Sequence, residues 1–81
     1  MKLNDTVAMM NSEDFKDRMR GEYHQLKIRA DGLEGMLKNY KSGNLKFTPK
    51  CSYELLHEQL VHMRQYQCVL EDRAKIEEVA L

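Results

Sequence analysis

Arginines, tyrosines and one adjacent lysine–phenylalanine pair are the side chains of this sequence whose chemistry best suits ligand binding. Guanidinium groups hold phosphate oxygens through forked hydrogen bonds, lysine attracts them as a point charge, and aromatic rings stack on bases. These residue types suit contacts to phosphate groups and bases, but by themselves they do not specify a biochemical activity. The candidate contacts are Arg18, Tyr23, Lys46, Phe47, Tyr66 and Arg73.

Arg18, Glu22, Tyr66 and Arg73 are expected to form one cluster if the two long periodic segments of the chain pack as antiparallel helices. Two interpretations of that cluster remain open. It is either a hydrogen-bonded network that fixes the register of the helices, or a pocket at a junction between subunits. Lys46 and Phe47 likewise belong either to an anion-binding, base-stacking surface or to an ordinary solvated loop.

Histidine and cysteine spacings do not support catalysis or metal binding. His57 and His62 are five residues apart, so they do not share a helical face as a four-residue spacing would allow. No cysteine or carboxylate set completes a tetrahedral metal site, and Cys51 and His57 lack an oxyanion-stabilising group nearby. We therefore predict a protein that is not an enzyme and that uses no metal ion or cofactor.

Length and charge limit the class of protein. With 81 residues the chain forms one domain at most, and a lone pair of helices of this size is marginally stable. Its 13 basic and 13 acidic residues balance, which argues against a protein that binds long nucleic acid by broad phosphate neutralisation. The marginal stability of a lone helix pair predicts that the chain has partners.

Cys51 and Cys68 lie 17 residues apart on one predicted helix, which separates them by about 25 Å and prevents them from pairing. The sequence has no recognisable signal peptide and no apolar run that could span a bilayer. We therefore expect no membrane contact and a reducing cytoplasm as the location.

The first long helix is predicted over residues 13–40, after a lead-in at 1–12 in which Asp5 either caps a short turn through Met10 or the terminus frays. Ser12 is the expected N-cap, and a basic turn followed by Gly43 marks the end. Apolar residues recur at alternating steps of four and three, the pattern of a helix seam. The seam consists of Met19, Tyr23, Leu26, Ala30, Leu33, Leu37 and Tyr40.

Three glycines inside this helix, Gly21, Gly32 and Gly35, each cost about 1 kcal/mol relative to alanine. All three lie off the seam. They either allow close approach of another helix in an oligomer or reflect neutral drift on a solvated face.

The connection is predicted over residues 41–48, with Leu45 and Phe47 closing the end of the core. Thr48 and Pro49 then favour a second helix over 49–78, followed by a tail at 79–81. This helix has a matching seam, and the two helices of equal length predict an all-α antiparallel hairpin. The second seam consists of Tyr53, Leu56, Leu60, Met63, Gln67, Leu70 and Ala74.

The second helix has more apolar surface than one partner can cover. Leu55, Val69 and Ile76 continue a separate stripe, with polar residues between them at helical spacing. Soluble monomers rarely expose such a patch. The stripe predicts that hairpins assemble into a homo-oligomeric helical bundle.

Two patterns give the chain a family resemblance. They are Phe15-x-x-Arg18-Met19-x-x-Glu22-Tyr23-x-x-Leu26 and Leu55-Leu56-x-x-Gln59-Leu60-x-x-Met63-x-x-Tyr66-x-x-x-Leu70-x-x-Arg73. Over roughly Phe15 to Glu77 the chain resembles a family of small helical-hairpin proteins of crAss-like and other bacteriophages. Its architecture is also similar to that of the phage sponges that block CBASS and Thoeris immunity.

This resemblance implies a phage accessory protein that sequesters a cyclic nucleotide signal without turning it over. Arg18, Lys46 and Arg73 are the expected phosphate contacts, and Tyr23, Phe47 or Tyr66 the stacking rings. The alternative is a protein-interaction module, in which the same flank of the hairpin docks a helix of a host protein.

Overall fold

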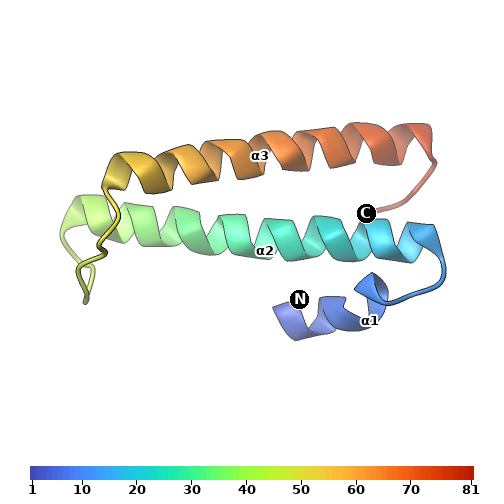
Figure 1. The fold of residues 1–81 in the computed structure, drawn as a ribbon, viewed down its shortest axis with the longest axis horizontal. Helices are drawn as coiled ribbons and strands as arrows, with labels where there is room; N and C mark the ends of the chain where they lie inside the picture. The colour runs from blue at the N-terminus through green and yellow to red at the C-terminus, as the bar shows by residue number, and fades with distance from the viewer.

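The computed structural model describes all 81 residues and contains only helices. A short 3-10 helix, η1 (Leu3–Thr6), leads into the single-turn helix α1 (Val7–Met10), and two long helices follow, α2 (Phe15–Ser42) and α3 (Tyr53–Ile76). Helices α2 and α3 run side by side in opposite directions, as Figure 1 shows. The predicted all-α hairpin is therefore confirmed.

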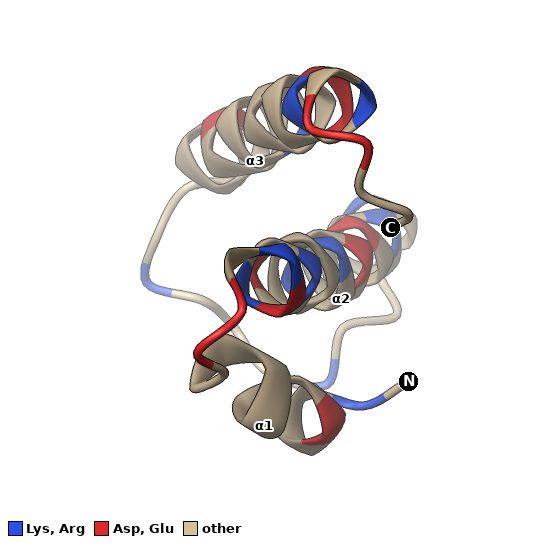
Figure 2. Ribbon diagram, turned by 90° about the vertical axis from the view of Figure 1, so that its right-hand side faces the viewer, with Lys and Arg blue, Asp and Glu red and all other residues tan.

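Helix α2 is the central element of the molecule. It contacts α3 along one side and α1 with η1 along another, whereas α1 and α3 do not touch each other. Figures 1 and 2 show α2 between the other two helices from both directions. Among the helices, α3 therefore packs against α2 only.

Both long helices begin later than the sequence pattern predicted. Helix α2 starts at Phe15 because Asp14, not Ser12, is its N-cap, and the Asp14 carboxylate accepts a hydrogen bond from the Lys16 amide. Helix α3 starts at Tyr53, where the Ser52 hydroxyl accepts from the Leu55 amide at 3.1 Å. The predicted start at Pro49 is wrong, since Ser52 is the N-cap and its hydroxyl satisfies one of the free amides of the first turn.

The core follows the two predicted seams but is thin, with only 11 of 81 residues buried. It is densest where the start of α2 meets the end of α3. There Tyr23 and Leu26 pack against Leu70, and Met19 packs against Ala74. In α3 the buried residues lie in the second half alone, so the end of the hairpin near the connection is packed more loosely.

The N-terminal segment explains one of the three helix glycines. Met9 and Met10 lie directly on Gly21, so closely that a Cβ atom there would sit 2.9 Å from the Met10 backbone nitrogen. The close approach predicted for another subunit is thus made, at Gly21, by the chain's own α1. At Gly32 and Gly35 nothing lies within 4 Å of the position that a Cβ atom would take, so both remain open. Asp5 accepts from the Lys2 amide in η1, so it does not cap α1.

The C-terminal tail folds back onto α2. Glu78 adopts a left-handed conformation with φ of 57°, which reverses the chain after α3. Val79 is then buried beside Met19 and Ala74, and the Arg20 guanidinium donates to the Ala80 carbonyl at 2.7 Å. The tail therefore closes the core at this end of the hairpin.

One apolar stripe of α3 is left uncovered. Its large apolar members are exposed, with Leu55 and Val69 at 55% and Ile76 at 81%. We call the whole set the α3 stripe. It consists of Leu55, Gln59, His62, Tyr66, Val69, Arg73 and Ile76.

Candidate functional site

The six candidate contacts do not converge on one place. Lys46 and Phe47 lie in the connection between α2 and α3, at one end of the molecule. Arg18, near the start of α2, and Arg73, near the end of α3, lie toward the opposite end. The molecule is 43 Å long, so one small ligand does not reach both groups within a single chain.

Arg18 and Tyr23 have structural partners. The Arg18 guanidinium donates to the backbone carbonyls of Ser12 and Glu13, both at 2.8 Å, and so holds the turn before α2. The buried Tyr23 donates its hydroxyl to the Glu71 carboxylate at 2.7 Å. That hydrogen bond, together with desolvation, raises the pKa of Tyr23 above its ordinary value.

Tyr66 and Arg73 belong to the exposed α3 stripe rather than to the helix interface. Neither side chain forms a hydrogen bond or an ion pair with any residue of the chain, Arg18 and Glu22 included. The predicted four-residue network is therefore wrong. Its members lie on different faces because Tyr66 and Arg73 are spaced seven residues apart along the side of α3 that turns away from α2.

The polar network that does join the helices centres on Arg64. Its guanidinium donates to Asp31 at 2.9 Å and Glu34 at 3.1 Å across the interface, and to Gln67 at 2.6 Å on its own helix. Hydrogen bonds from Lys27 and then Arg64 lower the pKa of Asp31. Sequence analysis missed Arg64, although its position directly after the seam residue Met63 placed it at the edge of the interface.

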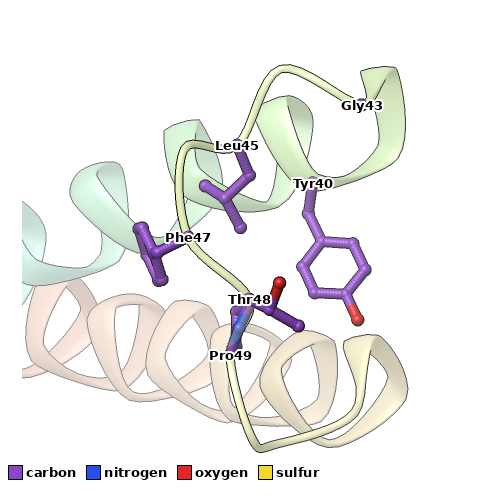
Figure 3. Close-up of a pocket in the computed structure, with 6 residues that line it drawn as sticks. All are labelled: Tyr40, Gly43, Leu45, Phe47, Thr48 and Pro49. Atoms are coloured by element: carbon purple, nitrogen blue, oxygen red, sulfur yellow. The ribbon is translucent and has the colours of Figure 1, made fainter.

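A solvent-open hollow of about 230 Å³ lies at the connection. We call it the connection hollow. Figure 3 shows Leu45 pointing into the space between Tyr40 and Phe47, with the Phe47 ring directed away from that of Tyr40. Phe47 is 58% exposed, so the prediction that it closes the core is wrong. The hollow is lined by Tyr40, Gly43, Leu45, Phe47, Thr48 and Pro49.

The chain around this hollow is positively charged. Residues 35–53 contain four lysines, Lys38, Lys41, Lys46 and Lys50, and no carboxylate. Lys41, Lys46 and Lys50 each directly follow a residue that lines the hollow. An anion that approaches the hollow therefore meets cations without competing acidic groups in the same segment.

A second hollow of about 200 Å³ opens between α2 and α3 at the same end. Lys41 lies over the ring of Tyr53 at 5.5 Å, and Tyr53 stacks on His57 with ring centroids 6.0 Å apart. An edge contact between Tyr40 and Tyr53 at 5.6 Å separates this hollow from the first. Glu34 lines this second hollow together with Lys38 and Lys41, so only the connection hollow has a lining without a carboxylate. Sequence analysis found these adjoining aromatic surfaces only in part, through Lys46 and Phe47.

No three histidine, cysteine or acidic side chains lie close enough to hold a metal ion. The two cysteines are free and exposed, with Cys51 just before α3 rather than inside it. None of the helices combines the length and the apolar character that crossing a membrane requires.

Comparison with known proteins gives one family. Residues 13–76 match the family model of Sequestin, which spans most of the chain. The chain belongs to the Sequestin family. The matched region contains all of α2, the connection and α3, and it leaves out η1 and α1. No curated protein and no solved structure matches the chain. The family name denotes sequestration, which is a binding role rather than a catalytic one.

Proposed function

We propose that this chain is a phage anti-defence protein that binds a cyclic nucleotide immune signal at the connection hollow and withholds it without chemical change. Membership of the Sequestin family supports the sequestering role. The resemblance to phage sponges supports the class of ligand. In this proposal the protein acts in the cytoplasm of the infected cell as a homo-oligomer, which the exposed α3 stripe supports.

The observation that carries the proposal is the exposed ring of Phe47 within a lysine-rich segment that has no carboxylate. A phenylalanine that is 58% exposed contributes little to the core, and its face is free to stack on a base. Stacking of a base on an aromatic side chain is worth about 1–3 kcal/mol. Lys46 and Lys50 stand on either side of this ring in the chain, where they suit phosphate oxygens.

The size of the hollows limits how the ligand binds. At about 230 Å³ and 200 Å³, both are below the roughly 300 Å³ at which pockets begin to enclose a drug-sized molecule. Each hollow suits one ring system rather than a whole dinucleotide. A cyclic nucleotide would therefore rest its base in a hollow and leave its phosphates at the lysine rim.

Isothermal titration calorimetry with cyclic dinucleotides, cyclic trinucleotides and cyclic ADP-ribose isomers tests this proposal. Phe47→Ala is expected to weaken binding of the ligand that gives heat about 5- to 150-fold, the equivalent of the stacking energy. Phe15→Ala is the matched control, because Phe15 is the chain's other phenylalanine, is also exposed at 44%, and lies at the opposite end of α2.

Lys46→Ala, compared with Lys75→Ala on α3, tests the phosphate contact in the same way. Ligand released by heating the complex should be chemically unchanged by chromatography, since no turnover is proposed. Binding that survives Phe47→Ala and Lys46→Ala would move the site away from the connection. No heat with any of these nucleotides would favour the protein-interaction role.

A further inference from the structure

The α3 stripe has the sequence pattern of a second helix seam. Its residues recur at alternating steps of four and three from Leu55 to Ile76, as in the seam that packs on α2. None of the other elements of the chain covers it, because α3 contacts α2 alone. Figure 2 shows α2 and α1 together on one side of α3, which leaves the far side open.

Two charges on or beside the stripe determine which orientation of a second copy fits. Glu58 lies near its start and Arg73 near its end, and both side chains are exposed. Arg73 has no ion-pair partner within the chain, and Glu58 has no lysine or arginine partner, only the imidazole of His62 at 3.7 Å. A parallel pair of α3 helices would set each of these charges against its own copy. An antiparallel pair sets Glu58 against Arg73 of the second copy, and the two-fold symmetry makes this contact twice.

We infer that the α3 stripe is the interface of a two-fold symmetric homodimer in which two α3 helices pack antiparallel. The symmetry axis passes near Tyr66, about midway between Glu58 and Arg73. Leu55 of each copy then lies toward Ile76 of the other, so the exposed apolar side chains at the two ends of the stripe become covered together. Each charge faces its opposite within about one helical turn.

The antiparallel arrangement separates the two connections. They lie at opposite ends of the dimer, because the start of α3 in one copy is next to the end of α3 in the other. The connection hollows are therefore independent. If the proposed ligand binds there, the dimer takes one molecule per chain. The dimer itself does not depend on that function.

Sedimentation equilibrium of the full chain at micromolar concentration tests the interface. The expected mass is twice the 9.6 kDa of one chain. Val69→Asp should yield the single chain. Val61→Asp is the matched control, because Val61 is an exposed valine of the same helix about 100° around its axis from the middle of the stripe. Equal masses for the two variants, or a monomeric wild type, would overturn the inference.

Charge reversal tests the orientation. Arg73→Glu and Glu58→Arg should each weaken the dimer about tenfold or more, because each replaces two attractive pairs with two repulsive ones. The double variant E58R/R73E should restore the wild-type dissociation constant. Lys75→Glu, which makes a similar charge change off the stripe, should leave it unchanged. Failure of the double variant to restore dimerisation would exclude the antiparallel arrangement, and circular dichroism would show that each variant keeps its helices.

Discussion

Replacing each of the three helix glycines with alanine offers a direct test of how the N-terminal segment packs. All three substitutions are made within α2 and add the same methyl group. At Gly32 and Gly35 that methyl group meets nothing within 4 Å. At Gly21 it would meet the side chain and the backbone nitrogen of Met10 at 2.9 Å and the Cβ atom of Met9 at 3.0 Å. The backbone contact cannot be relieved by rotating a side chain.

The expected energies have opposite signs. Alanine stabilises a helix by about 1 kcal/mol relative to glycine, so Gly32→Ala and Gly35→Ala should each raise the free energy of unfolding by up to that amount. Gly21→Ala gains the same helix propensity but forces α1 away or strains it, and overpacking of this kind costs about 1–3 kcal/mol. The net change at Gly21 should therefore be about 0 to 2 kcal/mol destabilising. A change of 1 kcal/mol corresponds to about 4–8 °C in a domain of this size.

Thermal unfolding by circular dichroism, at one protein concentration for all variants, measures these differences. Gly21→Ala should melt at or below the wild-type temperature, while the other two variants melt several degrees above it. Removing residues 1–11 should then convert Gly21→Ala into a stabilising change, because the contacts at 2.9 Å disappear. If Gly21→Ala raises the melting temperature of the full chain as much as Gly32→Ala does, α1 does not pack on α2 as described.

Two further substitutions test the packed end of the hairpin. Leu70→Ala should lower the free energy of unfolding, measured in urea, by about 2–5 kcal/mol, because Leu70 is fully buried. Val61 is exposed, so Val61→Ala should change it by less than about 0.5 kcal/mol. Similar values for the two variants would contradict the assigned core. Tyr23→Phe should cost about 1 kcal/mol at neutral pH. The hydrogen bond that raises the pKa of Tyr23 contributes its full stabilisation below the ordinary tyrosine pKa, near 10. That contribution is lost as the pH rises through the higher pKa of Tyr23 in the folded state. The difference between wild type and Tyr23→Phe should therefore shrink in urea titrations above pH 10, and a constant difference would refute the hydrogen bond to Glu71.

The two helix seams were predictable because they depend only on the spacing of apolar residues. Met19, Leu26, Leu37 and Leu70 are all buried as that spacing requires. The match of the seams also predicted the antiparallel hairpin. Periodicity reports which face of a helix is buried, and this information is local to each helix.

The start of α3 could not be decided from local signals, since two competing signals lie close together in the chain. Pro49 suits a first helical turn and Ser52 suits an N-cap. Only the structure shows that Ser52 caps the Leu55 amide, which leaves Pro49 free to line the connection hollow. Phe47 was misplaced for a related reason. The alternation of an extended strand assigned it to the core, whereas the chain bends through this segment and leaves the ring exposed.

Predicting the Arg64 network requires knowing the register between α2 and α3, and the sequence of a single helix does not reveal that register. Asp31 and Glu34 sit one turn apart on α2, and either could have faced several residues of α3. Position relative to the helix seam also separates the candidate ligand contacts into two groups. Tyr23 is on the seam and has a structural partner, whereas Lys46 and Phe47 lie off it and remain exposed.

The uneven packing of the hairpin places its buried core at one end and the proposed binding site at the other. The end at which α2 begins contains the buried clusters and the Tyr23–Glu71 hydrogen bond. The C-terminal tail also packs there, with Val79 buried in the core. The end with the connection has no fully buried residue of α3 and contains the two aromatic hollows with their lysines. Regions with few buried contacts open at low free energy and can adjust to a ligand while the rest stays folded. If the proposed site is at the connection, a substitution at Phe47 should for this reason change affinity with little effect on melting temperature, because the buried clusters that stabilise the chain lie at the other end.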